Sequence, residues 1–352
     1  MQIKDFHYLK KLLEAPGPSG FEQEVQKVFR SFASDFCDDV RTDVHGNVIA
    51  YKKGSLDKKI MLTAHIDEIG FMVRHIDDHG CVRFDSIGGV DPALLPGLAV
   101  RVYGNGGALD GIIGKKPIHL MDRDERNKAV KLEDLWIDIG AGSAGEARKM
   151  VSVGDYGTFM PSLTELPAGL IASKSLDDRI GVFIVSSVLR ELAGVRELPH
   201  IYVVSSVQEE VGLRGAVTSA YTIKPDIGIA VDVTHASDYP SIDKNKHGDI
   251  KLGEGCVFHV GANINSRVLS ILKNTAVQGG ISYQLEASPR NTGTEANAVQ
   301  LSRGGVATGL VSVPLRYMHS PNEIVSLKDA ERAIKVIAGF CKTIDKHTDL
   351  IP

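Results

Sequence analysis

Apolar residues recur at intervals of three and four along the first 36 residues, and this spacing predicts two helices. Phe6, Leu9 and Leu13 share one face of the first helix, which the Pro16-Gly17-Pro18 segment ends. The second helix lies between Phe21 and Phe36 and repeats the same spacing. The chain therefore begins with two amphipathic helices, each with an apolar face to bury.

From Val44 the pattern changes to short apolar runs bounded by Gly, Asp and Lys, which are typical of strands. Residues 59–64 predict a buried strand that leads directly into His65. Between about residues 71 and 166, alternating apolar positions and Gly pairs dominate, without a long amphipathic helix. This middle segment is therefore predicted to be a small all-β module.

After Ser173, predicted strands alternate with predicted helices. Apolar runs at 201–207, 227–231 and 306–313 predict buried strands, and Ser175-Leu176-Asp177-Asp178 resembles a capping box before a helix. Such alternation predicts an α/β fold with a mixed, mostly parallel sheet flanked by helices. We expect one α/β domain made of residues 1–70 and 167–352, with residues 71–166 inserted as a small all-β domain.

Composition narrows the possible functions. The 352 residues include 40 Lys and Arg against 44 Asp and Glu, a net charge of −4 that argues against nucleic-acid binding through gross positive charge. No apolar stretch reaches the roughly 18 residues of a membrane helix, and the first residues lack a signal-peptide pattern. The four cysteines are scattered without a CxxC pair, which favours a reducing cytoplasm over a disulfide framework.

The residues that follow the predicted strands are rich in carboxylates and imidazoles. Ligands of open α/β sheets bind beyond the carboxyl ends of the strands, so these side chains are candidates for one site. They are His65, Asp67, Glu209, Glu210, Asp232 and His319, joined by Asp177 and Asp178 from a strand-to-helix connection. Gathering so many acids would cost several kcal/mol unless cations balance them. Imidazole and carboxylate ligands without thiolate suit zinc, cobalt or manganese.

Each of these residues, taken alone, also has a purely structural explanation. Asp177 and Asp178 could be first-turn acids that the helix dipole favours. The adjacent Glu209 and Glu210 could lie in a solvated loop, and a single histidine such as His65 is more often a hydrogen-bonded structural residue. Their recurrence at several independent strand ends is what favours a metal site.

Five segments resemble, in order, the motifs of the M42 metallo-aminopeptidases, the family of glutamyl and deblocking aminopeptidases and of the tetrahedral TET peptidases. The segments are 64–71 (AHIDEIGF), 173–179 (SKSLDDR), 208–216 (QEEVGLRGA), 232–236 (DVTHA) and 316–321 (RYMHSP). The resemblance covers essentially the whole chain. It implies a zinc-peptidase-like, phosphorylase/hydrolase-like catalytic domain and, for residues 71–166, a β-barrel-like dimerisation domain.

The resemblance also implies a role for each candidate residue. Two divalent ions, zinc or cobalt with manganese as a third option, would be held by His65 and Asp232, by Glu210 and His319, and by Asp177 as a bridge. Glu209 would be the general base, and Asp67 would hydrogen-bond the far nitrogen of His65. The implied reaction is the hydrolysis of N-terminal residues from short peptides.

The same resemblance implies a large homo-oligomer, a hollow dodecamer, although a simple dimer is an alternative. Two positions depart from the family pattern. Glu295 stands where the family usually has Asp, and Leu315 stands where a small hydroxyl residue is common. Three other functions stay open: a metal-dependent amidase or deacylase acting on a non-peptide substrate, an endoglucanase-type glycoside hydrolase, and a non-catalytic scaffold.

Overall fold

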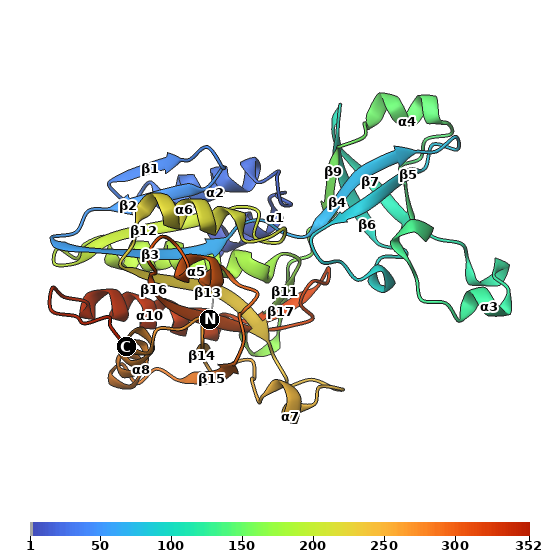
Figure 1. The fold of residues 1–352 in the computed structure, drawn as a ribbon. Helices are drawn as coiled ribbons and strands as arrows, with labels where there is room; N and C mark the ends of the chain where they lie inside the picture. Colours follow the sequence, from blue (N-terminus) through green and yellow to red (C-terminus); the bar gives the residue numbers. More distant parts are fainter. Residues whose placement is uncertain (1–2) are drawn as a thin grey trace.

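The structure, a computed structural model, describes residues 3–352 and consists of two parts (Figure 1). The larger part is an eleven-stranded mixed sheet with helices on both faces, and the smaller is a closed β-barrel at one end, as counted over these residues. None of the helices within residues 3–352 combines the length and the apolar character needed to cross a bilayer.

The large sheet has a parallel centre and antiparallel margins. Its strands are β1 (Asp39–Thr42), β2 (Val48–Lys52), β3 (Leu56–His65), β10 (Thr164–Leu166), β11 (Leu170–Ser173), β12 (Pro199–Ser206), β13 (Ile227–His235), β14 (Cys256–Gly261), β15 (Tyr283–Ser288), β16 (Ala307–Arg316) and β17 (Glu323–Ser326). They are ordered β1-β2-β12-β3-β13-β16-β17-β11-β10, and β14 and β15 branch from β16. Because β12, β3, β13 and β16 are parallel, their carboxyl ends meet at one edge of the sheet.

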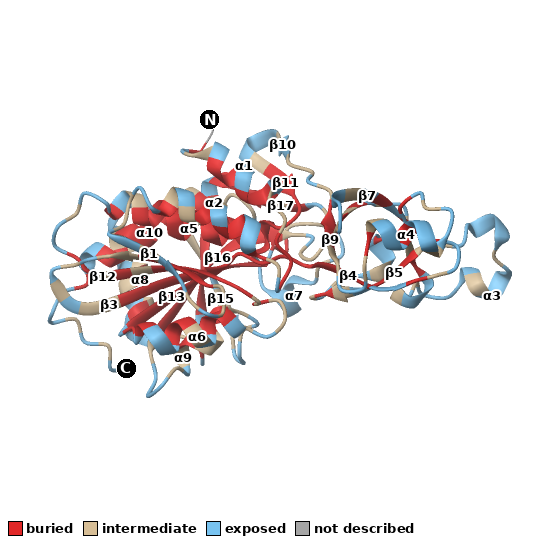
Figure 2. Cartoon of the chain, turned by 90° about the horizontal axis from the view of Figure 1, so that it is seen from above, coloured by how far each residue is buried: buried red, intermediate tan, exposed pale blue. Residues whose placement is uncertain are grey.

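Alternating side chains of β3 build the two cores of this domain. Ile60 and Leu62 point toward the main core, and Met61 points toward a smaller core on the opposite face. The main core packs against α1 (Phe6–Glu14), α2 (Gln23–Ala33), α5 (Leu176–Leu192), α8 (Ser266–Gln278) and α10 (Leu327–Thr343). The smaller core packs against α6 (Arg214–Ile223) and α9 (Glu295–Gln300). Figure 2 shows α5 as a buried helix lying on the sheet.

The inserted domain is a closed barrel with its own core. Its strands are β4 (Gly70–Ile76), β5 (Val82–Ile87), β6 (Ala99–Gly104), β7 (Gly107–Gly114), β8 (Trp136–Asp138) and β9 (Tyr156–Phe159), closed in the order β4-β5-β8-β7-β6-β9. Phe71, Val100, Ile137 and Phe159 fill the interior. The short helices α3 (Arg123–Arg126) and α4 (Ala144–Met150) belong to this domain, and α7 (Lys244–His247) belongs to the large one.

The predicted fold class is confirmed: an α/β domain with a sheet between helices and a small inserted β domain. Two details differ. β10 pairs with β11 in the large sheet, although residues 164–166 were expected within the insertion. The expected capping box is absent among the described residues, because Ser175 adopts a left-handed backbone (φ 60°) and its side chain caps no N–H group.

Candidate metal centre

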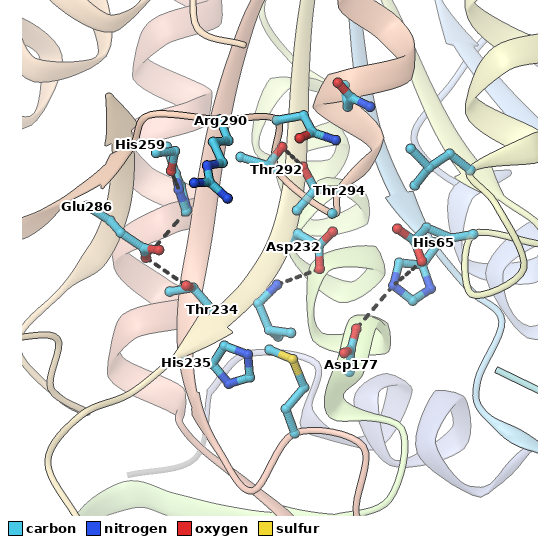
Figure 3. A pocket seen from close by; sticks show the side chains of 18 of the residues that line it. His65, Asp177, Asp232, Thr234, His235, His259, Glu286, Arg290, Thr292 and Thr294 are labelled. Atoms are coloured by element: carbon cyan, nitrogen blue, oxygen red, sulfur yellow. Dashed lines mark hydrogen bonds and ion pairs between the residues drawn. The ribbon is translucent and has the colours of Figure 1, made fainter. Parts of the chain in front are cut away.

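The candidate residues come together where the parallel strands end. His65 is the last residue of β3, Asp232 lies in β13, and Asp177 lies in the first turn of α5. Glu210 follows β12, and His319 follows β16. All five side chains line one cavity of about 710 Å³, and Glu209 lines it too. Figure 3 looks into this cavity, with His65 and Asp177 on one side of Asp232.

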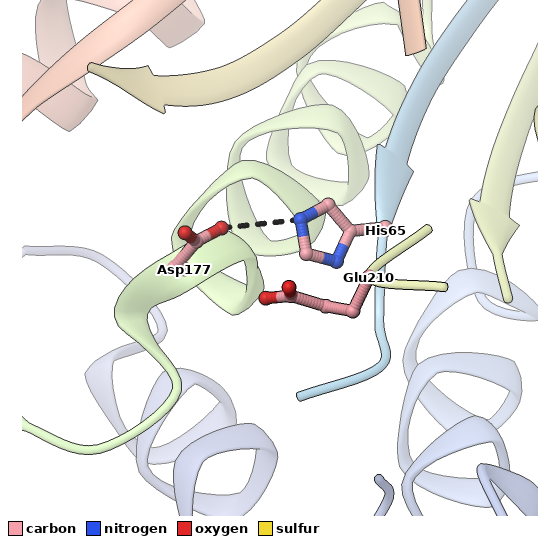
Figure 4. Close-up of side chains that lie close together, drawn as sticks. All are labelled: His65, Asp177 and Glu210. Atoms are coloured by element: carbon pink, nitrogen blue, oxygen red, sulfur yellow. Dashed lines mark hydrogen bonds and ion pairs between the residues drawn. The ribbon is translucent and has the colours of Figure 1, made fainter. Parts of the chain in front are cut away.

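Asp177 lies between the two histidines. Its Oδ1 is 3.1 Å from Nε2 of His65, and its Oδ2 is 3.5 Å from Nε2 of His319. Glu210 completes this half of the site, since its Oε1 is 3.3 Å from Nε2 of His319. Figure 4 shows Asp177, His65 and Glu210 converging from three separate elements. Each oxygen of the Asp177 carboxylate thus faces a different imidazole.

The orientation of His65 is set by Asp67, although by a different atom than expected. Nδ1 of His65 lies 3.1 Å from the main-chain oxygen of Asp67, whereas the carboxylate oxygen lies 3.6 Å away. The carboxylate instead accepts hydrogen bonds from Ser19 Oγ (2.7 Å) and from the backbone N–H groups of Glu209 (3.0 Å) and Glu210 (3.2 Å). Asp67 therefore holds the loop that carries both glutamates.

A second set of ligand atoms includes a residue to which the sequence assigned no role. Single atoms of His65, Asp178 and Asp232 all lie within 4.8 Å of one another, as do those of His65, Asp177 and Glu210. Asp178 is fully buried, and its Oδ2 accepts no hydrogen bond from residues 3–352. Adjacent residues of a regular helix point in different directions, but the backbone of Asp177 (ψ 108°) is not helical, and this lets both carboxylates approach the sheet.

The electrostatics of the cluster favour bound cations. Burial raises the pKa of Glu209 to about 10. The negative charges of Asp232 and Glu210 act in the same direction, and the charge of His65 opposes them. Burial likewise raises the pKa of Asp178 and of Asp232 well above the usual range. Burial also acts on Asp177, but hydrogen bonds from His319 and His65 hold the pKa of that carboxyl well below its usual range.

These residues fit a divalent metal. If Nδ1 of His65 donates to the main chain of Asp67, its Nε2 presents a lone pair to a carboxylate oxygen 3.1 Å away. Two acceptors at that separation require a cation between them, either a proton or a metal ion. Imidazole nitrogens and carboxylate oxygens are the donors that zinc and similar ions accept.

Beneath the site lies a buried ion network. Glu68, the neighbour of Asp67, accepts hydrogen bonds from Lys174 Nζ (2.5 Å), Arg179 Nη2 (2.8 Å) and the N–H of Gly17 (3.1 Å). Arg179 is fully buried and also donates to main-chain oxygens of the N-terminal segment. The network ties β3 to the turn that leads into α5, and therefore supports the residues on both sides of His65 and Asp177.

Glu295 lies behind the site rather than in it. Its side chain is 1% exposed, and it accepts hydrogen bonds from Thr63 Oγ1 (2.6 Å) and from Ser206 Oγ. It does not line the cavity described above. Its carboxylate thus contacts hydroxyl groups on two strands of the sheet, β3 and β12.

Two features near the site were not recognised from the sequence. Glu323, at the start of β17, accepts hydrogen bonds from the backbone of Asp177 and of His319. The barrel contributes a Gly88-Gly89 turn, where a Cβ atom at Gly89 would lie 2.9 Å from Nδ1 of His319. The only local signal for Glu323 is its position four residues after His319, and no local pattern indicates the Gly88-Gly89 segment.

The family model described as M42 glutamyl aminopeptidase matches residues 46–336. Lysyl aminopeptidase from Pyrococcus furiosus is 39% identical over 354 residues, which cover 99% of each chain. The TET aminopeptidase of Thaumarchaeota archaeon SCGC AB-539-E09 superposes with a TM-score of 0.93 at 34% identity over 98% of each chain. The Pyrococcus horikoshii TET1 peptidase, which can assemble into a tetrahedron or a large octahedral shell, has a TM-score of 0.86 at 31% identity, covering 96% of this chain and 99% of that one. These similarities confirm the predicted family and enzyme class: the chain belongs to the M42 family and is an aminopeptidase.

Proposed function

We propose that the protein is a dinuclear-metal aminopeptidase that releases N-terminal residues from short peptides. The observation that carries this proposal is the position of Asp177, whose two carboxylate oxygens face the Nε2 atoms of His65 and His319. A carboxylate shared in this way is suited to bridge two ions. His65 and Asp232 would hold one ion, Glu210 and His319 the other. Asp178, close to His65 and Asp232, is an additional candidate on the first side.

When bound, two zinc, cobalt or manganese ions supply Lewis acidity to a carbonyl oxygen and lower the pKa of a water molecule. Glu209 is the general base in this scheme. Its carboxylate lines the cavity, with Oε2 3.9 Å from Nε2 of His65. Bound cations would lower the pKa of this carboxyl from the value of about 10 that burial produces, so that it can accept a proton from the attacking water and donate it to the leaving amine. Asp67 fixes the main chain of Glu209 and thereby the direction of that carboxylate.

The cavity is suited to the end of a peptide rather than to a folded chain. Its volume of about 710 Å³ accommodates a few residues. The inner wall is rich in carboxylates, which attract a free α-ammonium group. The wall opposite His65 is polar, since Thr234 Oγ1 donates to Glu286 (2.7 Å) and His259 lies between two serine hydroxyls (Figure 3). Burial lowers the pKa of His259 to about 4, so that side chain is neutral at pH 7.

We further propose that the barrel mediates dimerisation within a large homo-oligomer, a dodecamer of the TET kind. Five large apolar side chains of the barrel domain are 47–69% exposed: Leu94, Ile112, Ile118, Leu120 and Val153. The barrel projects from one end of the large domain, where another copy of the chain could cover these side chains (Figure 1). The shells formed by the Pyrococcus horikoshii relative support the same idea.

The test of the proposed activity compares matched substrates and metal states. Full-length protein dialysed against a chelator should lose hydrolysis of aminoacyl-anilides, and zinc, cobalt or manganese should restore it. N-acetylated versions of the same anilides should remain intact, because they lack the α-ammonium group. Undiminished turnover by metal-free protein would contradict the metal centre. Faster turnover of the acetylated substrates would instead favour a deacylase.

A further inference from the structure

Glu323 occupies a junction between the two loops that carry Asp177 and His319. It is the first residue of β17, and its Cα lies opposite Ser173, the last residue of β11. The chain after β11 turns into α5 and Asp177, while the chain before β17 contains His319. The side chain of Glu323 is therefore enclosed between them and is 2% exposed.

The carboxylate divides its two oxygens between these loops. Oε2 accepts the backbone N–H of Asp177 at 3.0 Å, and Oε1 accepts the backbone N–H of His319 at 2.9 Å. One rigid, planar group thus spans the main chains of two candidate ligands whose side chains approach to 3.5 Å. Within residues 3–352, no other pair of candidate ligands is joined through a single side chain in this way. Asp67 joins the backbone of the candidate base Glu209 to that of the ligand Glu210.

Both loops need an external support, because their backbones leave regular conformations at this point. Tyr317 and His319 have φ values of 62° and 59°, in the left-handed region that non-glycine residues adopt rarely. Asp177, the second residue of α5, has a ψ of 108°, outside the helical range. Neither conformation is enforced by hydrogen bonds of a regular helix or strand. The Glu68 network supports the turn before Asp177, and Ser162 Oγ donates to the main chain of Pro321 in the other loop, but Glu323 is the side chain that joins the two loops to each other.

We propose that Glu323 is a positioning residue that fixes the separation of Asp177 and His319 and thereby sets the affinity of the metal centre. The inference rests on the proposed function, since it requires that these two side chains bind metal. Glu323→Gln preserves the size of the side chain, but its NH₂ group cannot accept a hydrogen bond. One of the two backbone N–H groups must then lose its partner, and the corresponding ligand becomes free to move.

Asp329 provides a matched control. It is a second fully buried carboxylate that accepts two backbone N–H groups, those of Gly253 (2.6 Å) and Gly255 (2.8 Å). It lies on α10 and lines no part of the cavity. Asp329→Asn therefore removes the same kind of hydrogen bond, together with an ion pair to Arg332 Nη1 (3.1 Å), from a buried position that has no contact with the proposed metal ligands.

The experiment compares the full-length wild-type protein with both variants. Cobalt binding is measured by calorimetric titration and by the visible spectrum of the cobalt-loaded protein, and the midpoint of thermal unfolding is measured for each. Residues that orient metal ligands typically contribute 10–100-fold to metal affinity or activity. We expect Glu323→Gln to weaken at least one cobalt site by that factor and to change the spectrum. Asp329→Asn should keep the wild-type cobalt affinity and spectrum, even if it lowers the midpoint of thermal unfolding as much as Glu323→Gln does.

Two results would overturn the inference. One is wild-type cobalt affinity and spectrum in Glu323→Gln, whatever its unfolding midpoint. The other is an equal loss of cobalt binding in Asp329→Asn, which would trace the loss to general destabilisation. If Glu323→Gln does not fold, Glu323→Asp is judged by the same criteria, because its shorter side chain cannot reach both loops. Failure of the wild type itself to bind cobalt would instead refute the proposed metal centre.

Discussion

Replacing Glu68 with Gln should destabilise the fold strongly, because it removes the only carboxylate shared by two buried cations in the described network. Lys174 and Arg179, 1% and 0% exposed, both donate to it, as do the Ser175 hydroxyl and the N–H of Gly17. Glutamine has the same shape but no charge, and only one of its two terminal groups accepts hydrogen bonds. The substitution therefore leaves two positive charges buried beside each other.

The expected loss of stability depends on how Lys174 and Arg179 respond when Glu68 is removed. Burial lowers the pKa of Lys174 to about 8, so without Glu68 that side chain can release its proton. Arg179 stays charged and must be desolvated without a counterion. Removing one partner of a buried ion pair costs about 3–5 kcal/mol. At about 2–4 °C per kcal/mol for a domain of this size, the midpoint of thermal unfolding should fall by roughly 10 °C.

The assay is calorimetric or denaturant unfolding of wild type, Glu68→Gln and a control, Glu24→Gln. Glu24 pairs with Lys27 on the surface, where the two side chains are 54% and 69% exposed. A pair of that kind contributes about 0.2–1 kcal/mol. A loss for Glu68→Gln no larger than that of the control would refute the reasoning.

The pH dependence gives a second check. Burial opposes ionisation of Glu68, but the charges of Arg179 and Lys174 outweigh it and lower the pKa of that carboxyl below its usual value. A carboxyl whose pKa is lowered by folding adds stability above the unfolded pKa of about 4.3. That stability is lost as the pH falls through the lower, folded-state pKa. The stability difference between wild type and Glu68→Gln should therefore be full at pH 7 and shrink in acid, and a difference that grew on acidification would contradict the assignment.

Three further predictions concern the site and the assembly. Glu209→Gln should reduce turnover by at least about 10²-fold with metal content nearly unchanged, because it removes a proton acceptor. Glu210→Gln should instead lose metal, which mass spectrometry measures alongside turnover. The opposite pattern in the two variants would reverse the two roles. Gly89→Ala should impair turnover, because its Cβ would lie 2.9 Å from Nδ1 of His319. Gly106→Ala is the control and should be neutral, because its Cβ meets no described heavy atom within 4 Å. Equal turnover of the two variants in a kinetic assay would exclude a role for the Gly88-Gly89 segment. Light scattering at micromolar concentration should give the mass of a large homo-oligomer, and a monomeric mass would rule out both the dodecamer and the simple dimer.

The strand-end residues could be predicted from the sequence because one geometrical rule governs them. Parallel strands of one sheet finish at the same edge, so polar residues directly after apolar runs must meet there. His65 and Asp232 follow this rule without any knowledge of loop conformation. The side chain of Asp177 could be placed near them because its helix starts at that edge.

The residues that escaped prediction depend on conformations that no periodic pattern records. Asp178 reaches the cluster because the first turn of α5 departs from helical geometry. Glu323 reaches Asp177 because β17 pairs with β11, strands about 150 residues apart in the chain. Asp67 orients His65 through its main chain, and an oxygen common to every residue leaves no trace in the sequence.

The arrangement of buried charges explains how the acidic cluster is kept available for cations. The segment from Lys174 to Arg179 holds two buried cations and, between them, the two buried acids Asp177 and Asp178. Had the cations paired with these acids, the site would be neutralised from within, and the affinity for metal would fall. Instead, both cations donate to Glu68, which lies one residue beyond Asp67 and does not line the cavity. Glu68 and Asp177 therefore have different roles. Glu68 balances the positive charge of Lys174 and Arg179 in this turn, and Asp177 remains directed at the two histidines.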